Sequence, residues 1–164
     1  MSTASNRPLR VLIVEDNPGD IRLIKEAFRE TNDGVETAMA KDGVEALDYL
    51  FKRSGFENVW QPDLMMLDLN LLKKSGHEVL AALKSDLHLQ HIPVIVFSSS
   101  AAPKDVTGAY GLGANCYVTK PADLDELFGV IALIDKFWLR AVRLPNEVGS
   151  ADNITASVSV AVHH

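Results

Sequence analysis

Short apolar segments alternate with amphipathic segments along this chain, and this alternation constrains its fold more than any other feature. Residues 9–14 are almost continuously apolar, as in a strand that is covered on both faces of a sheet. The expected strands cover residues 9–14, 35–40, 63–68, 93–97 and 115–118. The expected helices cover residues 18–30, 42–51, 76–84, 104–112 and 123–140. The alternation predicts an α/β fold with a doubly wound, five-stranded parallel sheet and five helices.

Length and composition favour one compact domain. The 164 residues are 47% hydrophobic and 23% charged, which suits one buried core but is short for two. A net charge of −6 disfavours a surface that binds nucleic acid through positive charge. The single cysteine, Cys116, excludes an internal disulfide framework and a thiolate-only zinc site. Because no apolar run approaches the roughly 18 residues that span a bilayer, and residues 1–8 lack the apolar core of a secretory signal, we expect a cytoplasmic protein that binds no membrane.

The ends of the chain differ from its middle in composition. Residues 1–8 form a polar tail, and the predicted domain covers residues 9–141. Residues 142–164 are interpreted as a C-terminal extension, which contains no lysine or arginine after Leu144. Its last valines alternate with small residues like an edge strand, but we expect disorder or order that depends on a partner. We expect no output domain in this extension, because the residues after Leu144 are too few for a conventional one.

Polar side chains follow four of the predicted strands at the points where the strands end. These side chains are Glu15, Asp16, Asp68, Ser98 and Lys120. In an open parallel sheet, functional groups gather outside the carboxyl ends of the strands. Crowded carboxylates repel one another unless they share a cation, and Mg²⁺ is commonly bound by carboxylates together with a phosphate. The pattern predicts Mg²⁺-dependent transfer of a phosphoryl group onto Asp68, which Lys120 and Ser98 assist.

Each of these residues also has a simpler interpretation. Glu15 and Asp16 are typical of the start of a helix, where carboxylates meet the positive end of the helix dipole. Asp68 is a common turn residue, Ser98 a common helix cap, and Lys120 an ordinary exposed charge. The combination, with each residue at the end of its own strand, favours the phosphoryl-transfer site.

The chain resembles the receiver domain of two-component response regulators over roughly residues 8–140. The matching features are the run Leu12–Asn17, Asp68 after an apolar strand, Gly76 in the next loop, the segment Pro93–Ser98, and Lys120-Pro121. The spacings between Asp68, Ser98 and Lys120 also match. The resemblance implies a flavodoxin-like sheet with strand order 2-1-3-4-5. It also implies a signalling protein that catalyses only its own phosphorylation and dephosphorylation, with a sensor histidine kinase as its partner.

The resemblance assigns a role to each matching position. Asp68 becomes the phosphoacceptor, Lys120 pairs with the phosphoryl oxygens, and Ser98 bonds one of them. Mg²⁺ would be held by Asp16, Asp68 and the backbone carbonyl of Asn70, with Glu15 acting through a water. Ser98 and Tyr117 would form a switch that reports phosphorylation to the face of the fourth helix, fifth strand and fifth helix. Two positions depart from the family pattern: Leu72 replaces a usual proline, from which we expect altered kinetics, and Ser98 replaces a commoner threonine.

A narrower resemblance points to the response regulators that partner bacterial phytochromes. It rests on the lengthened stretch 49–62, the run 115–121 and the closing Phe137-Trp138-Leu139. These regulators have no attached output module and are phosphorylated by a light-regulated histidine kinase. The resemblance therefore implies a phytochrome as the kinase of this chain.

The last predicted helix carries more apolar surface than one sheet requires. Its expected core stripe comprises Leu124, Leu127, Ile131, Ile134 and Trp138. Val130, Leu133 and Phe137 widen the apolar arc beyond the roughly 100° that packing on a sheet needs. We expect a homodimer through this helix, with help from the fifth strand and fourth helix. The alternative is a broad core contact that the C-terminal extension covers.

Three other functions compete with a phosphorylated signal transmitter. One is an aspartyl-phosphate phosphatase that uses Asp68-Leu69-Asn70 as its nucleophile motif, but Asn70 cannot protonate a leaving group and the chain is short for a substrate cap. Another is a receiver-like binding module without phosphotransfer, which the complete set of key side chains disfavours. A third is a receiver that drains phosphate from its kinase and has no downstream target.

Overall fold

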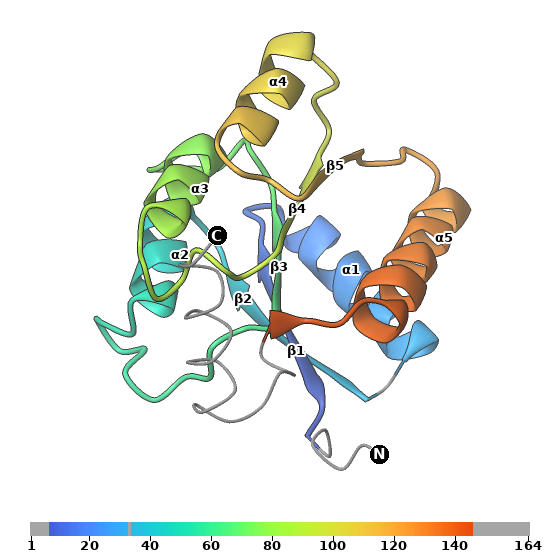
Figure 1. Cartoon of the computed structure of the whole chain (residues 1–164). Coiled ribbons are helices and arrows are strands. Elements are labelled where there is room, and N and C mark those ends of the chain that lie inside the picture. The colour runs from blue at the N-terminus through green and yellow to red at the C-terminus, as the bar shows by residue number, and fades with distance from the viewer. Residues whose placement is uncertain (1–6, 33, 146–164) are drawn as a thin grey trace, which may run out of the picture.

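The five parallel strands lie side by side in the order β2-β1-β3-β4-β5 in the computed structural model, which describes residues 7–32 and 34–145 (Figure 1). The strands are β1 (Leu9–Val14), β2 (Val35–Ala40), β3 (Leu64–Leu67), β4 (Val94–Ser98) and β5 (Cys116–Thr119). The helices are α1 (Pro18–Thr31), α2 (Gly43–Leu50), α3 (Gly76–Lys84), α4 (Pro103–Gly111), α5 (Leu124–Ile134) and η2 (Asp135–Ala141). The predicted fold class and strand order are confirmed.

The strand sequences are apolar because both faces of the sheet are covered. Along β1, Leu12 and Val14 point into the core beneath α2, α3 and α4, whereas Val11 and Ile13 point into the core beneath α1 and α5. All four side chains are buried. Figure 1 shows α2 and α3 on one side of the sheet and α1 and α5 on the other. Within the described residues, no helix is long and apolar enough to cross a bilayer.

Capping side chains start the helices that follow β1 and β3. Asn17 accepts a hydrogen bond from the backbone N–H of Asp20, and Pro18 occupies the first turn of α1. Ser75 begins α3 with a reciprocal capping box to Glu78.

The last helix differs from the prediction of one continuous α-helix over residues 123–140. The α-helix ends at Ile134 and continues as η2, a π-helix, in which the N–H of Val142 bonds the carbonyl of Phe137 five residues earlier. The wider turn changes which side chains face the core, so that Leu139 is buried. Leu124, predicted in the core stripe, is 52% exposed, which corrects that assignment: it lies in the first turn of α5.

A buried carboxylate connects the far ends of α1 and α5. Asp135 accepts hydrogen bonds from the side-chain amide of Asn32 at 2.9 Å and from Nε of Arg140 at 2.8 Å. Arg140 also donates to the carbonyl of Thr31, in the last turn of α1. Asp135 is therefore compensated by partners from both helices.

The chain remains packed beyond the predicted domain end at residue 141, because Leu144 is buried in the core beneath α1 and α5. The predictions for the N-terminal tail fall largely on residues 1–6, and those for the C-terminal extension, with its alternating valines, largely on residues 146–164. Both segments lie outside the described residues.

Candidate functional site

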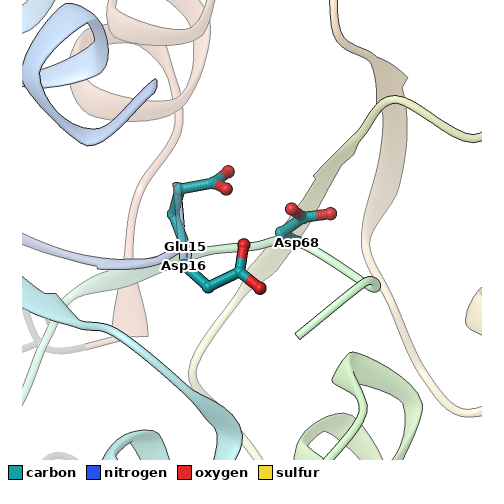
Figure 2. Close-up of side chains that lie close together, drawn as sticks. All are labelled: Glu15, Asp16 and Asp68. Carbon is teal, nitrogen blue, oxygen red and sulfur yellow. The ribbon is translucent and has the colours of Figure 1, made fainter. Parts of the chain in front are cut away.

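Three carboxylates meet at the carboxyl edge of the sheet. Glu15 and Asp16 follow β1 and Asp68 follows β3, and the register that pairs Val14 with Leu67 brings the two strand ends together. One oxygen from each side chain lies within 4.8 Å of the other two. Figure 2 shows the three side chains converging on one space. Glu15 and Asp68 are buried, and Asp16 is half-buried. The predicted convergence of these carboxylates is confirmed.

Lys120 brings a positive charge into this cluster. The N–H of Lys120 bonds the carbonyl of Ser98, which fixes the loop after β5 beside the end of β4. Its Nζ lies 2.6 Å from Oε1 of Glu15, 3.0 Å from Oδ2 of Asp20 and 3.2 Å from Oδ2 of Asp68. The ammonium therefore shares its protons among three carboxylates. Its single positive charge does not neutralise all three carboxylates.

The electrostatics of the cluster follow from burial and charge crowding. Burial raises the pKa of Glu15 to about 7, the ion pair with Lys120 opposes the rise, and the charge of Asp68 adds to it. Burial alone would lower the pKa of Lys120, but hydrogen bonds to Glu15 and Asp20 and the charge of Asp68 raise it above its usual range. Lys120 therefore stays protonated and the cluster keeps an excess of negative charge.

The donor set fits a hard divalent cation. Glu15, Asp16 and Asp68 offer only oxygen ligands at close range, with excess negative charge that one ammonium leaves uncompensated. Mg²⁺ and Mn²⁺ prefer such oxygen ligands. Asn70 follows in the loop after β3, where its N–H donates to Oδ1 of Asp68 at 3.2 Å. The role of its carbonyl as a ligand stays a prediction.

The loop after Asp68 is held by close backbone packing. A Cβ on Gly76 would lie 2.3 Å from the carbonyl oxygen of Asp68 and 2.5 Å from Cα of Leu69. The N–H of Gly76 bonds the carbonyl of Leu69 at 2.9 Å. Farther along, the carbonyl of Leu72 accepts a hydrogen bond from the N–H of Gly43. The main chain therefore anchors this loop, although Leu72 stands where the family resemblance leads us to expect proline.

Ser98 and Tyr117 connect the cluster edge to β5 and α4. Ser98 is fully buried at the end of β4, and its hydroxyl accepts a hydrogen bond from the N–H of Ser100. The Tyr117 hydroxyl donates to the carbonyl of Ser100 at 2.7 Å, and the N–H of Tyr117 bonds the Tyr110 hydroxyl on α4. Ser100 thus links both predicted switch residues. Movement of Ser98 and Tyr117 on phosphorylation stays a prediction.

Asp20 is the site residue that sequence reasoning missed. It lies in the first turn of α1, where an acidic residue has an ordinary explanation in the helix dipole. The available signal was its position four residues after Asp16, which places it above the same strand end. Asp20 and Lys120 both line a cavity of about 150 Å³ between α1 and the start of α5.

The model of one protein family, the response regulator receiver domain, matches residues 11–132. The chain belongs to this family. The receiver is 41% identical over 145 residues to the response regulator Rcp1 of Synechocystis sp., and the match covers 88% of this chain and 99% of Rcp1.

Solved structures agree with this assignment. The phosphorylated cyanobacterial phytochrome response regulator RcpA superposes on the receiver with a TM-score of 0.82 at 45% identity, covering 85% of this chain and 99% of that one. The Mn²⁺-bound form of Rcp1 superposes with a TM-score of 0.80 at 40% identity, covering 84% of this chain and 99% of that one. A receiver of this type therefore holds a divalent cation, and another carries a phosphoryl group.

Proposed function

We propose that this receiver accepts a phosphoryl group from a sensor histidine kinase onto Asp68, in a Mg²⁺-dependent reaction. The observation that carries the proposal is the convergence of Asp68 with Glu15, Asp16 and Lys120 at the carboxyl edge of the sheet. A buried carboxylate between a cation site and an ammonium is suited to accept a phosphoryl group. The receiver catalyses this modification of itself and its reversal, and turns over no separate substrate.

The residues divide the chemistry among them. One Asp68 oxygen attacks phosphorus, the bond between phosphorus and the donor's imidazole nitrogen breaks, and the imidazole leaves with that electron pair and is protonated. Lys120 Nζ, 3.2 Å from the attacking carboxylate, bonds a phosphoryl oxygen. The Ser98 hydroxyl bonds another. When bound, Mg²⁺ supplies positive charge to these oxygens, held by Asp16, Asp68 and the Asn70 carbonyl, with Glu15 acting through water.

Phosphorylation is read out through Ser98 and Tyr117. A Ser98 side chain that turns toward the phosphoryl group gives up the hydrogen bond from Ser100, whose carbonyl holds the Tyr117 hydroxyl. The local charge change thereby biases the face of α4, β5 and α5. This face is where we place the output of the receiver.

The kinase partner we propose is a phytochrome histidine kinase in the cytoplasm. RcpA is a cyanobacterial phytochrome response regulator, and it covers most of this chain at 45% identity. The receiver itself needs no chromophore, because the light-sensing pigment belongs to the kinase.

Two donors test the proposal on the full chain. With acetyl phosphate, intact-mass spectrometry should detect one added phosphoryl group in Mg²⁺ and none in EDTA. With a cyanobacterial phytochrome kinase and ATP, the rate of transfer should differ between red and far-red light. Absence of the adduct in Mg²⁺ would contradict the phosphoacceptor role. Equal transfer in both lights, or no transfer, would contradict the phytochrome partner alone.

The receiver is also proposed to form a homodimer through the outer surface of α5 and η2. Leu133 and Phe137 are 66% and 57% exposed, and Phe137 packs edge-on against half-buried Trp138 at 5.7 Å. Val130 lies one turn before Leu133 on the same helix. Exposed large apolar side chains in one patch typically mark an interface. We call these four residues the α5 face.

Phe137→Glu should convert a dimer into a monomer, because it places a charge at the centre of the α5 face, with an expected loss of affinity of about a hundredfold. Sedimentation velocity at micromolar concentration measures the change. Lys136→Glu, at the neighbouring exposed position, is the matched control and should keep the dimer. A wild-type protein that sediments as a monomer with and without an acyl-phosphate mimic would contradict the dimer.

A further inference from the structure

The Lys120 ammonium contacts carboxylates that a metal ion would also use. Its Nζ lies within hydrogen-bond distance of Glu15 and Asp68, which are two of the three carboxylates in the cation cluster. The side chain is only 12% exposed, so the ammonium cannot leave for bulk water without losing buried partners. A divalent cation bound at this cluster draws on the same two carboxylates that hold the ammonium, and its charge repels the ammonium.

Asp20 offers the ammonium a partner outside that cluster. Its Oδ2 lies 3.0 Å from Lys120 Nζ, and it approaches from the first turn of α1 rather than from a strand end. The Asp20 side chain is 39% exposed beside the cavity between α1 and α5. Its main chain is positioned independently of the ion pair, because its backbone N–H donates to the Asn17 side chain.

Resting on the proposed function, we infer that Asp20 is a positioning residue that holds the Lys120 ammonium when a divalent cation binds to Asp68 directly and to Glu15 through water. In the structure Lys120 bonds Glu15, Asp20 and Asp68. When the cation binds, Lys120 keeps its bond to Asp20 and stays charged beside Asp68. Without Asp20, the ammonium competes with the cation for the same two carboxylates, and metal affinity falls.

A double-mutant cycle on Mg²⁺ affinity tests this inference, because Asp20 must act through Lys120. Titration calorimetry of the full chain compares wild type, Asp20→Ala, Lys120→Met and the double variant. Asp20→Ala should raise the Kd for Mg²⁺ by about three- to tenfold, and Lys120→Met should lower it. In the Lys120→Met background, Asp20→Ala should change the Kd by less than half of the change that it causes in the wild-type background. Asp20→Asn, which keeps an acceptor oxygen without the charge, should fall between wild type and Asp20→Ala.

Two results would overturn the inference. One is an unchanged or lower Kd for Mg²⁺ in Asp20→Ala. The other is an equal rise in this Kd on Asp20→Ala in the wild-type and Lys120→Met backgrounds, which would mean that Asp20 acts by its own charge. Asp125→Ala, an exposed acidic position in the first turn of α5, controls for loss of a carboxylate outside the cluster and should leave the Kd unchanged.

Acetyl phosphate labelling of the same preparations distinguishes failure of the inference about Asp20 from failure of the proposed function. If wild type binds Mg²⁺ and takes the phosphoryl group while the cycle shows no coupling, only the inference about Asp20 fails. If wild type neither binds Mg²⁺ nor takes the phosphoryl group, the proposed function fails instead. Should an alanine or methionine variant fold poorly, Asp20→Asn and Lys120→Gln complete the same cycle.

Discussion

Asp68→Asn should abolish the Mg²⁺-dependent adduct, with a labelling rate at least about a hundredfold below that of wild type. The carboxamide oxygen is a poor nucleophile, and the substitution also removes one charged ligand from the cation cluster. The amide has nearly the shape of the carboxylate and can still accept the hydrogen bond from Asn70. The fold should therefore persist while the chemistry is lost. Labelling with acetyl phosphate, followed by intact-mass spectrometry, measures the rate.

Asp125→Asn is the matched control for this prediction, because it removes a carboxylate from an exposed position on α5. It should label at the wild-type rate. An Asp68→Asn protein that is folded by circular dichroism and still gains the phosphoryl mass in Mg²⁺ would contradict the assignment. Turnover of small phosphomonoesters by the wild-type protein would favour the phosphatase alternative.

Gly76→Ala should lower the free energy of unfolding by about 3 kcal/mol, because the new methyl group overlaps main-chain atoms. An ideal Cβ there lies 2.3 Å from the Asp68 carbonyl oxygen, and backbone cannot rotate away as a side chain can. Relief of the overlap requires the loop after β3 to move, and Asp68 moves with it. The phosphoryl-labelling rate should therefore fall together with stability. Urea denaturation and acetyl phosphate labelling measure the two effects.

Gly129→Ala provides the contrast within the same chain. A Cβ at this position on α5 would meet no atom of the described residues within 4 Å outside its own helical turn, so alanine should leave stability unchanged or raise it by up to about 1 kcal/mol. The two substitutions add the same methyl group to helical glycines, and only the surroundings differ. A Gly76→Ala protein with the wild-type urea midpoint and labelling rate would contradict the packing argument.

The sequence predicts the sheet and the carboxylate cluster well because both depend on local patterns. Val11–Val14 are apolar at every position because the strand is covered on both faces, and such a run is visible without a structure. Strand ends in a parallel sheet share one edge, so Glu15, Asp16 and Asp68 could be brought together from strand assignments alone.

Other features depend on contacts that sequence patterns do not encode. The Asp20 side chain meets Lys120 across 100 residues of chain, and an acidic residue in a first helical turn has its own local explanation. Helical spacing places Leu124 in the core stripe, but it lies in the first turn of α5 and is exposed. Farther along, the chain changes to a π-helix at Asp135 and buries Leu139. Asp135 itself is stabilised by Asn32 from α1.

The central claim, that Asp68 receives the phosphoryl group, is tested most directly by locating the modification on the chain. The receiver is treated with acetyl phosphate in Mg²⁺, reduced with borohydride, which converts an aspartyl phosphate to homoserine, and then digested and sequenced by mass spectrometry. We predict homoserine at position 68 alone, and none there when EDTA replaces Mg²⁺. Homoserine at another aspartate, or a stable phosphate on a serine or histidine with Asp68 unmodified, would contradict the assignment.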